Sequence, residues 1–98
     1  MSTIAFIQQL SDHLFWDVDR SSVDAEEHRQ FIIPRIMDRG TLDDVKAAWR
    51  YYGEENIREV LLGARVLQRK TISFFANQFD LSRESFRAFR NQTGTWDQ

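Results

Sequence analysis

Residues 72–90 read ISFFANQFDLSRESFRAFR, and this stretch decides how the chain is expected to fold. Apolar residues recur at intervals of three and four on both sides of a short polar break, which predicts two helices joined by a tight turn. Ala76 is small enough to stand where two such helices cross, and Ser82 can cap the second helix. The expected inward positions are Phe75, Phe79, Leu81, Phe86 and Phe89. The spacing is typical of a helix-turn-helix.

Arginines line the other side of the second predicted helix. In a helix-turn-helix that reads DNA, the first residues of the second helix meet the base edges in the major groove. Guanidinium groups bind both guanine and phosphate. We therefore expect nucleic-acid contacts from Ser82, Arg83, Arg87 and Arg90. An acidic protein partner would suit the same arginine face, so the sequence does not decide between DNA and protein as the ligand. Asp80 also stands at the turn position that usually carries glycine, which weakens the helix-turn-helix prediction.

The rest of the chain also has helical periodicity. Ile4, Ile7, Leu10 and Leu14 predict a first helix that ends near residues 15–16, and residues 17–22 predict a structured loop. Asp24 with Glu27 resembles a capping box for a helix that carries Phe31, Ile32, Ile36 and Met37 and stops at Gly40. Pro34 lies inside that helix, where we expect a kink or a break.

Two more helices are expected before the C-terminal pair. Thr41 with Asp44 predicts a cap for a helix that ends at Gly53, and its expected buried stripe is Leu42, Val45, Trp49 and Tyr52. A further stripe comprises Ile57, Val60, Leu61, Ala64 and Leu67. The prediction is an all-α protein: one compact domain of five or six short helices over residues 1–90, followed by a mobile polar tail at 91–98.

Composition narrows the class of protein. Ninety-eight residues suit a single domain, and the lack of cysteine removes disulfides and thiolate metal sites. No signal peptide and no apolar run of membrane-spanning length is visible, so we expect a cytoplasmic protein. Residues 1–57 hold 6 basic and 11 acidic side chains, whereas residues 58–90 hold 7 and 3. This division fits either two surfaces with different partners or two halves that attract each other.

Few residues point to catalysis. The acidic pairs Glu26/Glu27, Asp43/Asp44 and Glu54/Glu55 each fall in the first turn of an expected helix, where the helix dipole favours negative charge. His13 and His28 fall on polar helix faces. No phosphate-binding glycine loop, nucleophile elbow or zinc motif is present. We therefore expect no enzyme activity, no cofactor and no metal site.

Thirteen aromatic residues mostly follow the spacing of a core. Three depart from it: Phe15 and Trp16 stand beside the acidic loop, and Trp96 lies in the polar tail. Aromatic side chains often carry the binding energy of protein interfaces. Phe15, Trp16 and Trp96 are therefore the predicted partner-binding residues, and packing as satellites of the core is the alternative that stays open for them.

Several short motifs resemble one bacterial family in order and spacing. They are LFWDVD at 14–19, FII at 31–33, DRGTLDD at 38–44, YYG at 51–53 and IREVL at 57–61, and the likeness covers roughly residues 10–90. The family comprises short proteins often encoded beside nucleotidyltransferase-like toxins of the abortive-infection type. The chain differs from the family pattern at Pro34, where a charged residue is more usual.

The resemblance implies an antitoxin that binds and silences a cognate toxin. On this hypothesis the basic C-terminal helix also contacts operator DNA, as a homodimer that spans two half-sites. Two alternatives stay open: a stand-alone helix-turn-helix transcription regulator, and a protein-interaction adaptor that does not bind DNA.

Overall fold

The computed structural model describes residues 3–91, and every regular element in that range is helical. The elements are α1 (Thr3–Gln9), η1 (Asp12–Phe15), η2 (Arg20–Ser22), α2 (Arg29–Arg39), α3 (Leu42–Tyr52), α4 (Glu54–Gly63), α5 (Arg69–Gln78), η3 (Arg83–Ser85) and α6 (Arg87–Asn91), where η marks a 3₁₀ helix. The all-α prediction is confirmed. Trp96 and the predicted tail beyond Asn91 lie outside the described residues.

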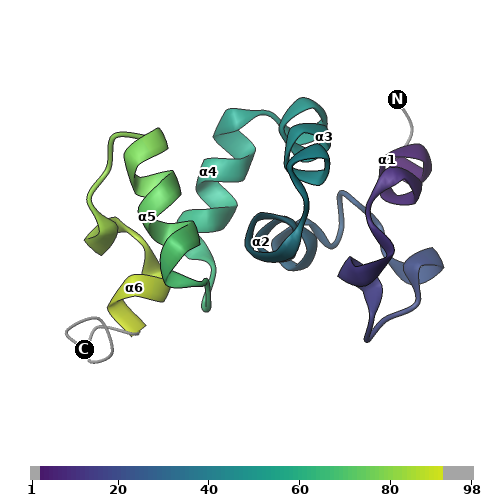
Figure 1. Cartoon of the computed structure of the whole chain (residues 1–98), viewed down its shortest axis with the longest axis horizontal. Coiled ribbons are helices and arrows are strands. Elements are labelled where there is room, and N and C mark those ends of the chain that lie inside the picture. Colours follow the sequence, from purple (N-terminus) through teal and green to yellow (C-terminus); the bar gives the residue numbers. More distant parts are fainter. Residues whose placement is uncertain (1–2, 92–98) are drawn as a thin grey trace.

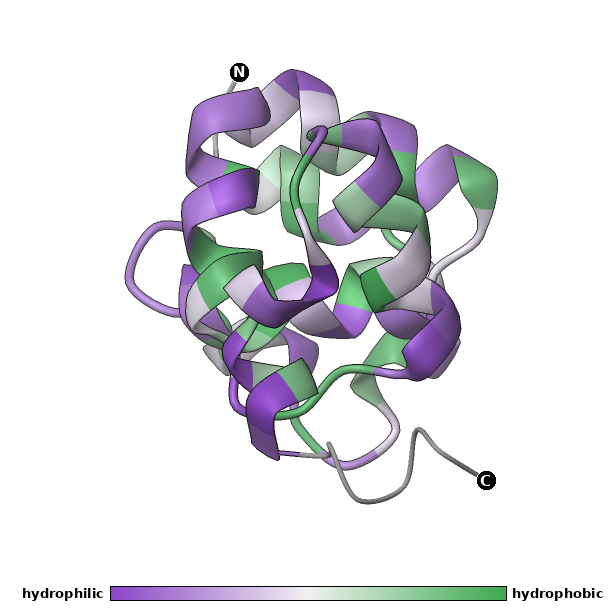
Figure 2. Ribbon diagram, turned by 90° about the vertical axis from the view of Figure 1, so that its left-hand side faces the viewer, coloured by the Kyte–Doolittle hydropathy of each residue, from purple (hydrophilic) through white to green (hydrophobic). Residues whose placement is uncertain are grey.

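The helices follow one another along an elongated body of about 40 × 26 × 22 Å, with α1 near one end and α6 near the other (Figure 1). Helix α4 packs against α2, α3 and α6, so it joins the two ends. Hydrophobic turns gather toward the middle and hydrophilic turns face outward (Figure 2). The largest fully buried side chains are Phe6, Leu14, Ile32, Ile33, Ile36, Ile57, Leu61, Leu67, Ile72 and Phe86.

The first predicted helix is wrong in its length. Helix α1 ends at Gln9, and a separate 3₁₀ helix, η1, follows. The break comes at Ser11, whose backbone is extended and whose N–H donates to Asp44 Oδ1 at 3.0 Å. Leu10 and Leu14 are buried nonetheless, so the apolar spacing correctly marked the core but not the helix end.

The cap predicted at the start of α3 is confirmed. Thr41 Oγ1 accepts the N–H of Asp44 at 3.2 Å, and Asp44 Oδ2 accepts the N–H of Thr41 at 2.9 Å. Gly40 precedes this cap, and a Cβ there would lie 2.5 Å from the Ile36 carbonyl oxygen and 2.9 Å from Asp44 Cβ. A side chain at Gly40 therefore has no room. Because Asp44 also holds Ser11, one carboxylate joins the start of α3 to the N-terminal region.

Helix α2 departs from expectation at its start and at its proline. Asp24 Oδ1 accepts the N–H groups of Glu26 and Glu27, but it caps a single turn ahead of α2, and the reciprocal acceptor is His28 Nδ1, not Glu27. Of the kink or break predicted at Pro34, the break does not occur, because α2 runs unbroken from Arg29 to Arg39; the kink stays a prediction. The side chains that pack α2 against the core are Ile32, Ile33, Ile36 and Met37.

Two buried stripes also need correction. In α3, Leu42 is 68% exposed and Val45 and Trp49 are half-buried, whereas Ala47, Ala48 and Tyr52 are buried. Gly53 ends α3 as predicted, with φ at +86°, a value that favours glycine. Helix α4 ends at Gly63, so Leu67 is buried from the following loop and not from the helix.

The C-terminal pair is partly as expected. The predicted turn is a Schellman motif: the Leu81 N–H donates to the Ala76 carbonyl, the Asp80 N–H donates to the Asn77 carbonyl, and Asp80 has φ +57°. The second helix is interrupted. Residues 83–85 form η3, Phe86 is extended, and α6 begins only at Arg87. Ser82 makes no side-chain cap. Phe75 and Phe86 are buried as predicted, whereas Phe79, Leu81 and Phe89 are half-buried.

Candidate partner-binding surface

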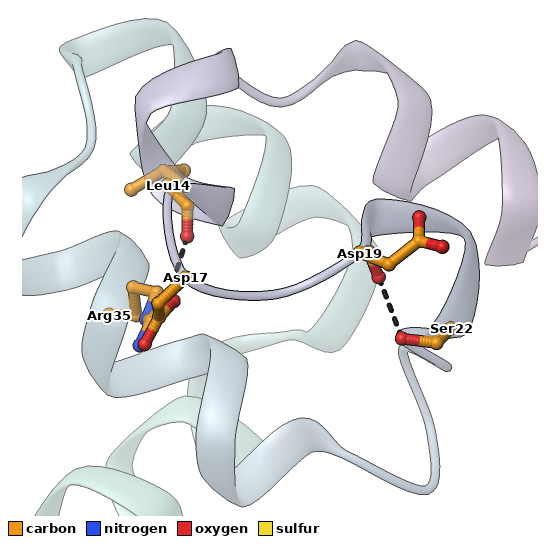
Figure 3. A network of polar contacts seen from close by, with 5 residues as sticks. All are labelled: Leu14, Asp17, Asp19, Ser22 and Arg35. Carbon is orange, nitrogen blue, oxygen red and sulfur yellow. Dashed lines mark hydrogen bonds and ion pairs between the residues drawn. The ribbon is translucent and has the colours of Figure 1, made fainter.

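The loop between η1 and α2 is fixed by two arginines, each of which pairs with an aspartate and lies over an aromatic ring. Arg20 binds Asp12 at 2.7 Å, donates to the Gln8 carbonyl at 3.0 Å, and lies 4.6 Å from the centre of the Phe15 ring. Inside the loop, Asp19 Oδ1 accepts from the N–H and the hydroxyl of Ser21. The predicted structured loop is confirmed, and its end at Asp19–Ser22 appears in Figure 3.

The second arginine comes from α2. Arg35 reaches from the helix to the loop, where its two terminal nitrogens bind the two carboxylate oxygens of Asp17, at 2.5 and 3.1 Å (Figure 3). It also donates to the Leu14 carbonyl at 2.9 Å. The hydrogen bond from Arg35 holds the pKa of Asp17 below its ordinary value of 3.8. Because a paired guanidinium fork has one favoured geometry, Arg35 fixes the loop relative to α2.

Two exposed aromatic rings flank the Arg35 guanidinium. Its carbon lies 4.4 Å from the centre of the Phe31 ring and 5.9 Å from that of Trp16. Trp16 is 67% exposed and Phe31 is 39% exposed. We call Trp16, Phe31, Arg35 and Asp17 the aromatic patch. It presents two apolar rings to solvent around a cation that is already paired.

The predicted partner-binding residues Trp16 and Phe15 differ in their exposure to solvent. Trp16 is the most exposed member of the aromatic patch, as an anchor for a partner would be. Phe15 is only 8% exposed and belongs to the core, beneath Arg20, so its prediction as a surface anchor is wrong. Its spacing explains the burial, because Leu14 and Phe15 both turn inward from η1.

Sequence reasoning missed Phe31 and Arg35. Phe31 was assigned to the core stripe of α2. The four buried side chains of α2 form a stripe that does not include Phe31. Arg35 follows Phe31 by four residues on the same helix face, and this spacing could have predicted that the two side chains are in contact. The partnership of Asp17 with Arg35 joins residues 18 apart and has no local signature.

The predicted nucleic-acid residues do not share one face. Arg83, in η3, lies over the Phe89 ring at 5.7 Å. Arg90 donates to the Glu84 carbonyl at 2.9 Å. Arg87 instead faces a cleft beside α4. A common face required one continuous helix from Arg83, and the extended backbone at Phe86 breaks it.

The histidines contact backbone groups, and two of the three acidic pairs lie in the helical turns predicted for them; Glu26 and Glu27 instead precede α2, which has no acidic residue in its first turn. His13 Nε2 contacts the Arg39 carbonyl oxygen at 2.7 Å, and His28 accepts the Asp24 N–H. Asp43 and Asp44 lie in the first turn of α3, and Glu54 and Glu55 in that of α4, as predicted. Within residues 3–91, no three metal-binding side chains gather into a group that could hold an ion. No helix in this range has the length and apolar character needed to cross a bilayer.

The fold and the surface define a small helical protein with a preformed aromatic patch. The chain belongs to DUF6922, a family of unknown function, whose model matches residues 10–61. All four residues of the aromatic patch lie within the matched range, whereas α5, η3 and α6 lie beyond it. No curated protein and no solved structure matches the chain.

Proposed function

We propose that this protein is a non-enzymatic, antitoxin-type binding protein that silences a cognate nucleotidyltransferase-like toxin by direct contact through the aromatic patch. The carrying observation is the exposed Trp16 beside Phe31 and the paired Arg35. Tryptophan and arginine are the residue types most enriched among those that dominate interface energy. Contact of this kind needs no catalytic group.

The rigidity of the patch supports the proposal. Arg35 makes three hydrogen bonds, to Asp17 and to the Leu14 carbonyl, before any partner arrives. Ordering a long side chain on binding costs about 0.5–1.5 kcal/mol, and a side chain that is already ordered avoids much of that cost. The patch therefore presents the Arg35 guanidinium in a fixed position beside its two rings.

Operator binding stays a prediction that this proposal does not need. The reader helix on which that hypothesis depends is interrupted at Phe86. Homodimer formation likewise stays a prediction.

The test is co-expression with the product of the adjacent open reading frame. We expect that product alone to stop growth, and the two proteins together to restore growth and to co-purify. The variant Trp16→Ala should lose both effects. Leu42→Ala is the matched control, because Leu42 is 68% exposed on α3 and takes no part in the patch. A harmless neighbour that forms no complex would remove the proposal, as would a Trp16→Ala variant that still protects.

A further inference from the structure

A cleft of about 410 Å³ opens beside α4, and arginines from three separate segments converge on it. Arg29 comes from the first turn of α2, Arg65 follows the end of α4, and Arg87 comes from the first turn of α6. The packing of α4 against both α2 and α6 brings them together (Figure 1). Their separation along the chain hides the cluster from sequence reasoning.

The positive charge of this cleft is poorly balanced. Among the lining residues that the structure describes, Glu59 is the single acidic one, against three guanidinium groups. Within residues 3–91, no ion pair shorter than 4 Å joins Arg29, Arg65 or Arg87 to a carboxylate. Like charges gathered in a concave site raise the local concentration of anions. The arginine cleft therefore carries a net positive charge that an anion can neutralise.

The remaining lining indicates which anion fits. Gln30 and Asn56 add side-chain amides, and the Asn56 amide is held in place by a 2.7 Å hydrogen bond to the Tyr52 carbonyl. The apolar part is made of Val60, Gly63 and Ala64, and none of the described lining residues has an aromatic ring on which a base could stack. The volume lies in the range typical of small-molecule sites. Guanidinium forks match the tetrahedral oxygens of phosphate, and phosphate carries more charge than one carboxylate.

We propose that the arginine cleft binds a phosphate-bearing ligand, held by Arg29, Arg65 and Arg87. Phosphate is the recognised chemistry, whether it comes from a small phosphorylated molecule or from a nucleic-acid backbone. The site is separate from the aromatic patch: at about 100° per residue along α2, Phe31 lies about 200° around the helix from Arg29. The two sites share no residue, so each can be changed without replacing a residue of the other.

Gly63 supplies a direct test. A Cβ at Gly63 would meet nothing within 4 Å, so the first atom of a new side chain has room there. Gly63→Glu adds a carboxylate to the lining that contains the three arginines. Gly63→Gln places a neutral group of the same size and serves as its matched control. Arg87→Gln removes one guanidinium from an exposed position.

The measurement is a titration of the full chain with sodium pyrophosphate at low ionic strength, followed by amide chemical shifts. We expect saturable shifts at residues around Arg65 and Arg87, affinity at least 10-fold weaker in Arg87→Gln, no binding in Gly63→Glu, and retained binding in Gly63→Gln. A short DNA duplex, titrated in parallel, separates the two sources of phosphate. If the duplex binds through the same residues more tightly than pyrophosphate does, the ligand is a nucleic-acid backbone. If the duplex binds more weakly than pyrophosphate, the ligand is a small phosphorylated molecule. Absence of saturable binding by both probes overturns the proposal, and so does tighter binding of a poly-glutamate peptide than of pyrophosphate.

Discussion

Replacing Asp44 with asparagine tests how the N-terminal region is held to α3. Asp44 is 3% exposed, and its two carboxylate oxygens accept the N–H groups of Ser11, at 3.0 Å, and Thr41, at 2.9 Å. Asparagine has the same shape but only one acceptor oxygen. Its amide nitrogen must therefore face one of the two backbone donors, which is left without a partner.

The expected cost follows from these bonds. A donor left without a partner in this part-buried position costs about 1–3 kcal/mol, and the loss of charge from the other hydrogen bond adds about 1 kcal/mol. The total of about 2–4 kcal/mol is a large part of the roughly 5–15 kcal/mol that stabilises a domain. With a urea slope of about 1.3 kcal/mol per M, the unfolding midpoint of Asp44→Asn should fall by about 1.5–3 M.

The assay is urea unfolding at pH 7, followed by circular dichroism. Asp43→Asn is the matched control, because Asp43 is exposed in the same helical turn and contributes mainly through the helix dipole, about 0.3–1 kcal/mol. Equal midpoints for the two variants would refute the role assigned to Asp44.

A pH series adds a second check on the same residue. Burial alone raises the pKa of Asp44, but the hydrogen bonds from Ser11 and Thr41 outweigh burial and hold the pKa below 3.8. A carboxyl whose pKa is lowered by folding stabilises the folded state above its unfolded pKa and loses that effect as pH falls through its folded pKa. The stability advantage of the native protein over Asp44→Asn should therefore be constant above about pH 4 and shrink below it.

Two further substitutions have defined outcomes. Asp80→Gly should raise the free energy of unfolding by about 0.5–1 kcal/mol, because Asp80 has φ +57° and glycine adopts this conformation without strain. The midpoint of thermal unfolding should rise by about 2–8 °C. An unchanged or lower midpoint would contradict the strain assigned to this turn. Tyr52→Phe should cost about 1–3 kcal/mol, because the buried Tyr52 hydroxyl donates to the Ala25 carbonyl at 2.7 Å; a urea midpoint equal to that of the native protein would show that this hydrogen bond does not stabilise the fold.

Local signals in the sequence predicted much of the fold. The Thr41–Asp44 cap, the stop at Gly53 and the turn after α5 each depend on neighbouring residues, so the sequence pattern contains them. The early end of α1 could not be predicted in this way, because it depends on a bond from Ser11 to Asp44, 33 residues away. The interruption at Phe86 has a related cause: its ring is fully buried from an extended residue, which a helical stripe does not anticipate.

The candidate site was predictable only in part. Trp16 stood out because it departs from the core spacing, and it is exposed. Its neighbour Phe15 also departs from the core spacing, but Phe15 is buried. Tertiary packing decides which of two adjacent rings turns inward, and the spacing of residues does not. Arg35 and the arginine cleft depend on contacts between segments far apart in the chain, which periodicity and capping rules do not describe.

The central claim is that the aromatic patch binds the toxin, and the affinity of the purified pair tests it most directly. Truncating a central interface residue typically costs 2 kcal/mol or more, which is about a 30-fold loss of affinity. The claim predicts a dissociation constant at least about 30-fold weaker for Trp16→Ala and within about 2-fold of native for Leu42→Ala, with both variants folded by circular dichroism. Equal affinity of the native protein and Trp16→Ala would contradict it.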